Sequence, residues 1–163
     1  MKIFRTLSSK GFTLIELLVS ISVFAILVGI ITLNLNTAKH NVDLQTTVET
    51  LLTDISQQQI KAMVGDTEGR TSPDNYGINF DANKYTLFHG AYSDTESSNF
   101  SVNLADVFQM STTLPSSVLV FAKGSGEIVG FDSDSNSITV IDTANNQQKT
   151  ILLNKYGVVT AVN

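Results

Sequence analysis

The sequence predicts an α+β protein in which one long N-terminal helix packs on a small head of antiparallel β-sheet. Residues 12–64 combine an unbroken apolar run with a later apolar stripe at helical spacing. Residues 76–163 contain short runs of alternating apolar and polar residues, separated by turn-forming residues. The length of 163 residues allows one such helix and one small domain.

The first eleven residues form a basic leader that carries Lys2, Arg5 and Lys10 and ends at Gly11. The apolar run that follows, residues 12–35, contains one charged residue, Glu16. At about 1.5 Å rise per residue, these 24 residues would span about 36 Å, enough to cross a hydrocarbon core of about 30 Å. An ionised carboxylate near the end of a membrane helix costs up to a few kcal/mol, so Glu16 indicates a function.

The junction Lys10-Gly-Phe-Thr-Leu-Ile-Glu-Leu17 resembles the prepilin cleavage signature of type IV pilins and type II secretion pseudopilins. In that family a membrane-embedded peptidase cuts after the glycine and methylates the new amino terminus. The resemblance implies cleavage between Gly11 and Phe12, and N-methylation of Phe12. It also implies that Glu16 sets assembly register by pairing with the amino terminus of a neighbouring subunit.

The local chemistry agrees with this role for Glu16. Phe12 and Glu16 are predicted to lie one helical turn apart on one face, and the helix dipole favours a carboxylate near the N-terminus. A free amine facing the carboxylate would neutralise both charges in lipid.

Two other interpretations of the segment are a secretory signal peptide and a plain signal anchor. A signal peptide has an apolar core of about 7–15 residues that ends at a small-residue cleavage site. The core here is longer, carries an early Glu16 and is followed by no such site. In a plain signal anchor, Glu16 would have no role.

The charge distribution places the two ends of the chain on opposite sides of a membrane. The formal charge is −5, from 10 basic and 15 acidic residues. Without the three basic residues of the leader, 7 basic residues remain against 15 acidic ones, a formal charge of −8. The basic leader favours the cytoplasm, and the acidic remainder argues against a nucleic-acid surface. The absence of cysteine excludes disulfides, which many pilins contain in the C-terminal region.

Residues 36–64 are predicted to extend the helix as an amphipathic segment. Its apolar stripe consists of Leu44, Val48, Leu51, Leu52, Ile55 and Ile60. Gly65 supplies a stop. Residues 65–75 then form a linker rich in turn-forming residues.

The head, residues 76–163, is predicted to contain two small antiparallel sheets. The predicted strands are 76–80, 84–88, 118–121, 128–131, 138–141, 150–153 and 158–160. Residues 81–83 are a hairpin signal between the first two strands. Residues 90–115 are predicted to be irregular. Their expected apolar anchors are Phe100, Val102, Leu104, Val107 and Phe108.

The head is also similar to the H-type minor pseudopilins and their minor-pilin relatives (GspH/FimT-like). The similarity lies in a strand ending in Phe, a Gly-rich turn, and a final pair of strands closed by a glycine turn. The matching residues are Phe121, Gly124, Gly126, Ile138, Val140, Ile151, Leu153, Gly157 and Val159.

Chemical motifs in the head are weak. Residues Asp132, Asp134 and Asn136 have the spacing of the first calcium-loop ligands, but Ser137 and Thr143 occupy the positions that require Gly and Glu, which favours a polar turn. His40 and His89 are isolated and are expected to be surface or core residues. The sequence therefore predicts no metal site, no cofactor and no enzymatic activity.

The function that follows from the resemblance is a structural subunit, most similar to a minor pseudopilin or pilin, of a type II secretion pseudopilus or a type IV pilus. Its implied partners are prepilin peptidase, other subunits through the N-terminal helix, and an inner-membrane assembly platform. It would cross the bacterial inner membrane once, with the head outside the cytoplasm, and then enter the fibre. The alternative is a tip-located minor pilin for DNA uptake or adhesion. DNA binding by a basic C-terminal tail is not expected, because residues 154–163 contain only Lys155.

Overall fold

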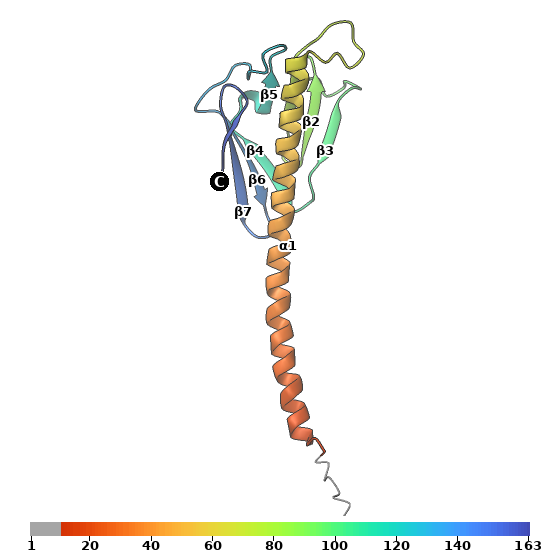
Figure 1. Cartoon of the computed structure of the whole chain (residues 1–163), viewed down its shortest axis with the longest axis vertical. Coiled ribbons are helices and arrows are strands. Elements are labelled where there is room, and N and C mark those ends of the chain that lie inside the picture. Colours follow the sequence, from red (N-terminus) through yellow and green to blue (C-terminus); the bar gives the residue numbers. More distant parts are fainter. Residues whose placement is uncertain (1–10) are drawn as a thin grey trace, which may run out of the picture. The chain divides into compact units, whose positions relative to one another are not determined.

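The computed structural model describes the backbone of residues 11–163 and the side chains of residues 11–29 and 43–163. The chain divides into two compact units, Met1–Lys39 and His40–Asn163. Helix α1, Leu14–Val64, contributes to both units, and all the described strands belong to the second (Figure 1). The helix begins two residues later than predicted, because Thr13 caps it and Phe12 precedes it. Of the predicted leader, residues 1–10 lie outside the described residues.

In the first unit, every described side chain from residue 11 to residue 29 is exposed. Large apolar residues are among them: Phe12, Leu14 and Phe24 are 84%, 81% and 68% exposed. Within the described residues, no helix combines the length and the apolar character needed to span a membrane. The predicted membrane half spans residues 12–35, and the side chains of residues 30–35 lie outside the described residues. The finding therefore covers only part of the predicted segment.

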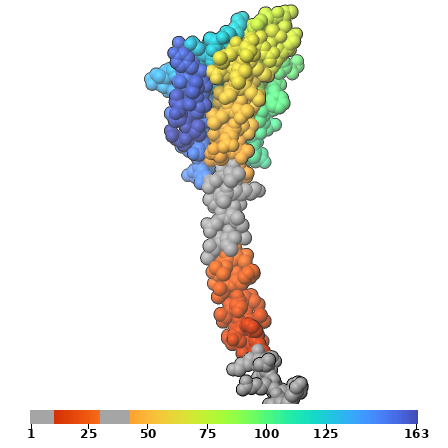
Figure 2. Space-filling view, in the orientation of Figure 1, coloured from red at the N-terminus to blue at the C-terminus, as the bar shows by residue number. Residues whose placement is uncertain are grey.

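The second unit buries one face of α1. Leu44, Val48, Leu51 and Ile55 are at most 3% exposed, and their spacing of three and four residues places them on one side of the helix. The opposite side faces solvent. Figure 2 shows it exposed between the C-terminal strands in blue and the strands near residue 100 in green.

The prediction that Ile60 belongs to this buried stripe is wrong. Ile60 is 57% exposed, and the buried face continues instead through Gln58 and Ala62. Ile60 is five residues beyond Ile55, a rotation of about 140° around the helix, so the two side chains point to different sides.

Helix α1 ends where the glycine stop was predicted. Gly65 has a φ of +67°, a conformation that costs glycine little. Its N–H donates to the carbonyl of Ala62, and the N–H of Asp66 donates to the carbonyl of Lys61. This is the Schellman arrangement, which satisfies carbonyls that the helix end leaves without partners.

The second unit contains two antiparallel sheets, as predicted, and each has four strands. The first has the order β3-β2-β1-β5 and the second the order β4-β6-β7-β8. The strands of the first sheet are β1 (Tyr76–Phe80), β2 (Lys84–His89), β3 (Phe100–Asn103) and β5 (Val118–Phe121). Those of the second are β4 (Phe108–Thr112), β6 (Ser137–Asp142), β7 (Gln147–Leu153) and β8 (Val159–Val162). A 3-10 turn, η1 (Pro115–Ser117), precedes β5.

Three predictions for the head were wrong. Residues 90–115 contain β3 and β4, because pairing with β2 and β6 stabilises strands that alternate over only four or five residues. Phe100, expected as an anchor, is 65% exposed on the edge strand β3. Residues 128–131 form one isolated bridge, Phe121↔Ile128, rather than a strand.

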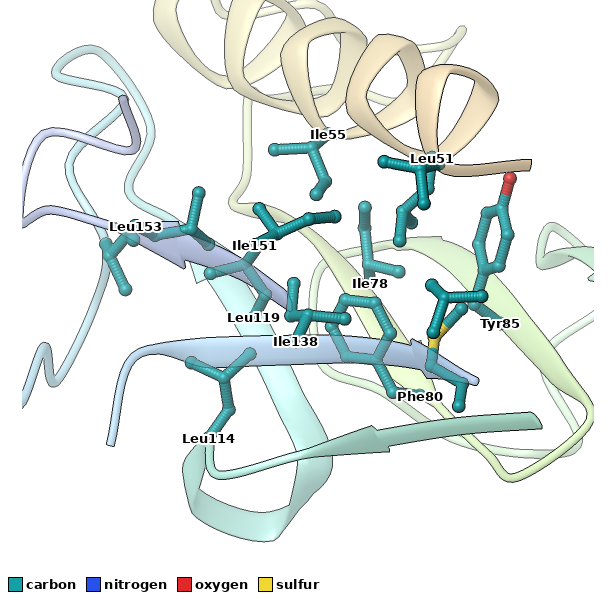
Figure 3. Close-up of a cluster of buried hydrophobic side chains, with 14 of the residues drawn as sticks. Leu51, Ile55, Ile78, Phe80, Tyr85, Leu114, Leu119, Ile138, Ile151 and Leu153 are labelled. Carbon is teal, nitrogen blue, oxygen red and sulfur yellow. The ribbon is translucent and has the colours of Figure 1, made fainter. Parts of the chain in front are cut away.

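The core of the second unit lies between α1 and the two sheets. Leu51 and Ile55 point from α1 toward Ile78 of β1 and Ile151 of β7 (Figure 3). Because both sheets contribute to one cluster of buried residues, the helix stripe joins them.

Gly77 of β1 lies opposite Phe88 of β2 and has no room for a side chain. A Cβ at this position would come within 2.3 Å of the Phe88 ring and 2.7 Å of the carbonyl oxygen of Leu119. The backbone carbonyl cannot move without disturbing the pairing of β1 with β5.

We expect Gly77→Ala to lower the unfolding free energy of a fragment of residues 40–163 by about 3 kcal/mol, through overpacking. The control is Gly69→Ala, which has nothing within 4 Å of its Cβ position and a φ of +83°. Backbone strain alone should cost it about 1 kcal/mol. Urea unfolding measures both values, and equal losses would contradict the packing argument.

Tyr85 connects β2 to α1 through a hydrogen bond from its hydroxyl to the Asp54 carboxylate. The side chain is 1% exposed. Burial raises the pKa of the Tyr85 phenol well above its usual range, and the bond to Asp54 raises it further. The folded state therefore favours the protonated phenol.

Because the folded pKa is the higher one, this stabilisation is complete below about pH 10 and is lost as pH rises above it. We expect the stability of residues 40–163 to fall above pH 10, and to fall less steeply in Tyr85→Phe. Urea unfolding at pH 7.5 and at pH 11, followed by far-UV circular dichroism, tests this. Identical pH slopes in the two proteins would refute it.

Candidate functional site

The predicted site residues lie at the start of α1. Gly11 and Phe12 precede the helix, and Glu16 is in its first turn. Although Phe12 is not helical, Phe12, Ile15 and Glu16 line one surface depression together with Val19. Phe12 and Glu16 therefore lie on the same side, as the spacing suggested.

Thr13 and Glu16 form a reciprocal cap at the helix N-terminus. The Glu16 N–H donates to Thr13 Oγ1 at 3.3 Å, and the Thr13 N–H donates to Glu16 Oε2 at 2.9 Å. The Thr13 hydroxyl also donates to Glu16 Oε2, at 2.8 Å. This is a capping box, in which a carboxylate three residues after a threonine satisfies an unpaired backbone donor.

Both of these bonds to the carboxylate are made at Oε2. Among the described residues, Glu16 Oε1 has no hydrogen-bond partner, although a carboxylate oxygen can accept two. The cap thus holds the carboxylate in place while leaving it able to accept a further donor from another molecule.

The sequence analysis missed Thr13. The signal was present, because Thr13-Leu-Ile-Glu16 before an apolar run is the capping-box pattern. The pattern was missed because the helix was predicted to begin at Phe12, and a Thr13 inside the helix would have no capping role.

Hydroxyl groups in the apolar segment are satisfied locally. Ser20 donates to the carbonyl of Glu16 and Ser22 to that of Leu18, at 2.7 and 2.8 Å. Such bonds let serine occupy an apolar helix without an unpaired donor. Among residues 12–29, Glu16 has the only ionisable side chain.

The calcium-like sequence forms a turn. The Asp134 N–H donates to Asp132 Oδ1 at 3.0 Å, and the Asn136 amide donates to the Leu153 carbonyl at 2.9 Å. The Asp132 carboxylate therefore closes the turn, and the Asn136 amide holds the turn against β7. The described residues contain no group of three or more His, Cys, Asp or Glu side chains that could hold a metal.

The two predicted isolated histidines have different outcomes. His89 is a core residue, 3% exposed and stacked on Tyr76 with ring centroids 4.3 Å apart. The side chain of His40 lies outside the described residues. The Gly124-Ser125-Gly126 segment is a turn, as predicted, closed by a bond from the Ala122 N–H to the Glu127 carbonyl.

A family model described as the prokaryotic N-terminal methylation motif matches residues 7–32. The match supports a type IV pilin-like family and indicates a precursor of the type IV pilin or pseudopilin kind. It implies processing by prepilin peptidase and assembly with other pilins. Comparisons with curated proteins and with solved structures gave no match.

We expect Thr13→Val to destabilise the first turn of α1 by about 1 kcal/mol, the typical cost of losing an N-terminal cap. The matched control is Thr53→Val, whose hydroxyl only bonds back to the Glu49 carbonyl. Hydrogen exchange of the amides of residues 14–18, in the full chain in detergent, measures the effect. If both variants exchange at the parental rate, the cap has no energetic role.

Proposed function

We propose that the chain is a structural subunit, of minor-pseudopilin or minor-pilin type, of a type II secretion pseudopilus or a type IV pilus. Prepilin peptidase cuts it between Gly11 and Phe12 and methylates the Phe12 amine. The subunit crosses the inner membrane once, with its head outside the cytoplasm, until an assembly platform adds it to the fibre.

The observation that carries this proposal is a fully exposed apolar segment with one positioned carboxylate. Residues 12–29 expose large apolar side chains on all sides, which is unfavourable in water. Lipid covers such a surface before assembly, and neighbouring helices cover it afterwards. By contrast, the second unit has a buried apolar core of its own, although single apolar side chains such as Ile60 and Phe100 are exposed on it.

The capping box fits both stages. Cleavage after Gly11 leaves the Thr13 N–H and hydroxyl intact, so Glu16 keeps these two donors while the subunit waits in lipid. The unpaired Oε1 then accepts the methylated amine of a neighbour. Because an unpaired carboxylate in lipid is costly, docking at any other height is disfavoured.

The H-type assignment rests on the head. Phe121, Ile138, Val140, Ile151 and Leu153, which carry the resemblance, are all buried in the core. The glycines of the pattern lie in turns and have positive φ. These are the roles that a shared sheet architecture requires of them.

A structural role also agrees with the surface charge of the head. β8, Val159–Val162, contains no basic residue, and Lys155 Nζ lies 3.5 Å from the Glu127 carboxylate. We therefore do not expect the C-terminal region to bind nucleic acid.

Two substitutions separate processing from assembly. We expect Gly11→Val to block cleavage, so that the precursor accumulates and Phe12 is not methylated. Glu16→Gln should be cleaved, but its recovery in sheared fibres should fall at least tenfold, because the neutral amide cannot neutralise the positive charge of the amine. Mass spectrometry of the amino terminus and immunoblots of the fibre fraction measure these effects.

The control is Glu49→Gln, which removes an exposed carboxylate from the same helix within the second unit. Its incorporation should equal that of the parent. Parental incorporation of Glu16→Gln would refute the register role, and normal processing of Gly11→Val would refute the cleavage site.

A further inference from the structure

The second unit contains a cavity of about 260 Å³ between α1 and the first sheet. Gln58 and Lys61 of α1 form one wall, β2 forms another, and Glu68 of the linker closes the end. Figure 1 shows α1 running beside β2 and β3 at this level. The volume lies just below the usual range of about 300–1,000 Å³ for small-molecule pockets, so a ligand the size of one side chain fits.

The inner part of the cavity is lined by polar groups that have no partner. Gln58 and His89 are 4% and 3% exposed. The Gln58 Oε1 atom and both ring nitrogens of His89 are buried and make no hydrogen bond. Buried polar atoms in folded proteins are nearly always bonded, and each unbonded one costs about 1–3 kcal/mol. Both side chains line the cavity, so a donor bound there can satisfy Gln58 Oε1 and one ring nitrogen of His89.

The spacing of the acceptors defines where a donor would lie. His89 Nδ1 is 3.9 Å from Glu68 Oε2, too far apart for a direct hydrogen bond. A nitrogen placed about 2.9 Å from each atom would bond both, with an angle of about 85° at the nitrogen. Gln58 Oε1 supplies a third acceptor at the same cavity, and an ammonium group has three donors.

The charges around the cavity favour a cation. Asp54 and Glu68 are carboxylates, and Lys61 compensates one of them through a 2.6 Å ion pair with Glu68 Oε1. The Asp54 carboxylate accepts only the neutral Tyr85 hydroxyl. One negative charge is thus left without a cationic partner at the cavity, and the mature chain is acidic as a whole.

The neighbouring charges do not change this balance. Arg70 bonds the His89 carbonyl and the Ser98 hydroxyl from outside the cavity. Asp74 lies beside it, since a Cβ on Gly90 would be 3.3 Å from Asp74 Oδ2 and 3.4 Å from Arg70 Nη1. The two residues carry opposite formal charges and so add no net charge to the surroundings of the cavity.

The remaining walls suit an alkyl chain. Leu87 and Phe88 of β2 and the exposed Phe100 of β3 line the cavity. The aromatic stack of Tyr76 on His89 forms a flat surface beside them, and Lys61 Nζ already lies 5.6 Å from the Tyr76 ring centroid. The cavity thus combines carboxylate and neutral acceptors with an apolar wall.

We propose that this cavity binds a primary alkylammonium group, either the side chain of a lysine on another protein or a free alkylamine. The ammonium bonds Glu68 Oε2, His89 and Gln58 Oε1, and its methylene chain packs on Leu87 and Phe88. The proposal does not depend on the proposed function, because it concerns only residues of the second unit.

The test uses the full chain in detergent micelles at pH 8, where alkylamines remain protonated. The chain has two histidines, so the imidazole resonances of His89 report on the cavity and those of His40 serve as an internal control. The probes are n-butylamine and Nα-acetyl-lysine methylamide, whose side-chain ammonium is free. Neutral n-butanol and anionic butyrate are the matched negative probes.

We expect the amines to shift the His89 resonances in a saturable way and to leave His40 unchanged. Gln58→Leu and Glu68→Gln should each raise the Kd at least tenfold. Gln58→Leu should keep the parental Tm or exceed it, because it removes an unbonded buried acceptor. Glu127→Gln is the control, since Glu127 is also paired with a lysine, Lys155, but lies away from the cavity, and it should bind normally.

Binding of both probes would indicate a site that accepts lysine side chains, and binding of n-butylamine alone would indicate a site for free amines. The proposal is overturned if n-butanol shifts His89 as strongly as n-butylamine, if His40 responds equally, or if no probe shifts His89. In the last case water alone would satisfy the buried atoms. Parental affinity in Glu68→Gln would also refute it.

Discussion

The burial of one stripe of α1 is the interaction on which the rest of the structure depends. Leu44, Val48, Leu51 and Ile55 are almost completely buried and contact residues of both sheets. Neither four-stranded sheet covers its own apolar face, and the chain has no disulfide to join them. The helix stripe therefore supplies the common core, and the Tyr85–Asp54 bond and the glycine-capped helix end hold it in register.

The same helix has a different character in each unit. In the second unit it is amphipathic, with one buried side and one exposed side. Among residues 14–29 it is apolar on all sides, and its serine hydroxyls bond to carbonyls of the same helix. Its polar groups therefore need no water, except for Glu16 Oε1, which the Thr13–Glu16 cap leaves without a partner. Assembly thus uses the part of the helix that folding leaves uncovered.

Much of the fold was predictable because local patterns were strong. The strands that alternate clearly, such as 76–80 and 84–88, were predicted almost to the residue, and Gly65 marked the helix end. β3 and β4 were not, since Phe100–Asn103 is a mostly exposed edge and depends on pairing with β2. Residues 128–131 have the composition of a strand, but only Ile128 forms a bridge. Whether such a segment becomes a strand depends on pairing with a segment distant in the sequence, and its composition does not reveal that pairing.

The sequence by itself indicated a precursor of the type IV pilin or pseudopilin kind, because the junction from Lys10 to Leu17 is a local motif that needs no tertiary contact to be recognised. It also determined the helical stripe and the two-sheet head, which follow from residue spacing. Only the tertiary structure decided that Ile60 faces solvent, that Thr13 caps the helix on Glu16, and that Gln58 and His89 meet at one cavity. Gln58 and His89 are 31 positions apart in the sequence. The sequence shows only that Gln58 interrupts an apolar stripe. Folding brings His89 to the same cavity and leaves Gln58 Oε1 and the His89 ring nitrogens without hydrogen bonds.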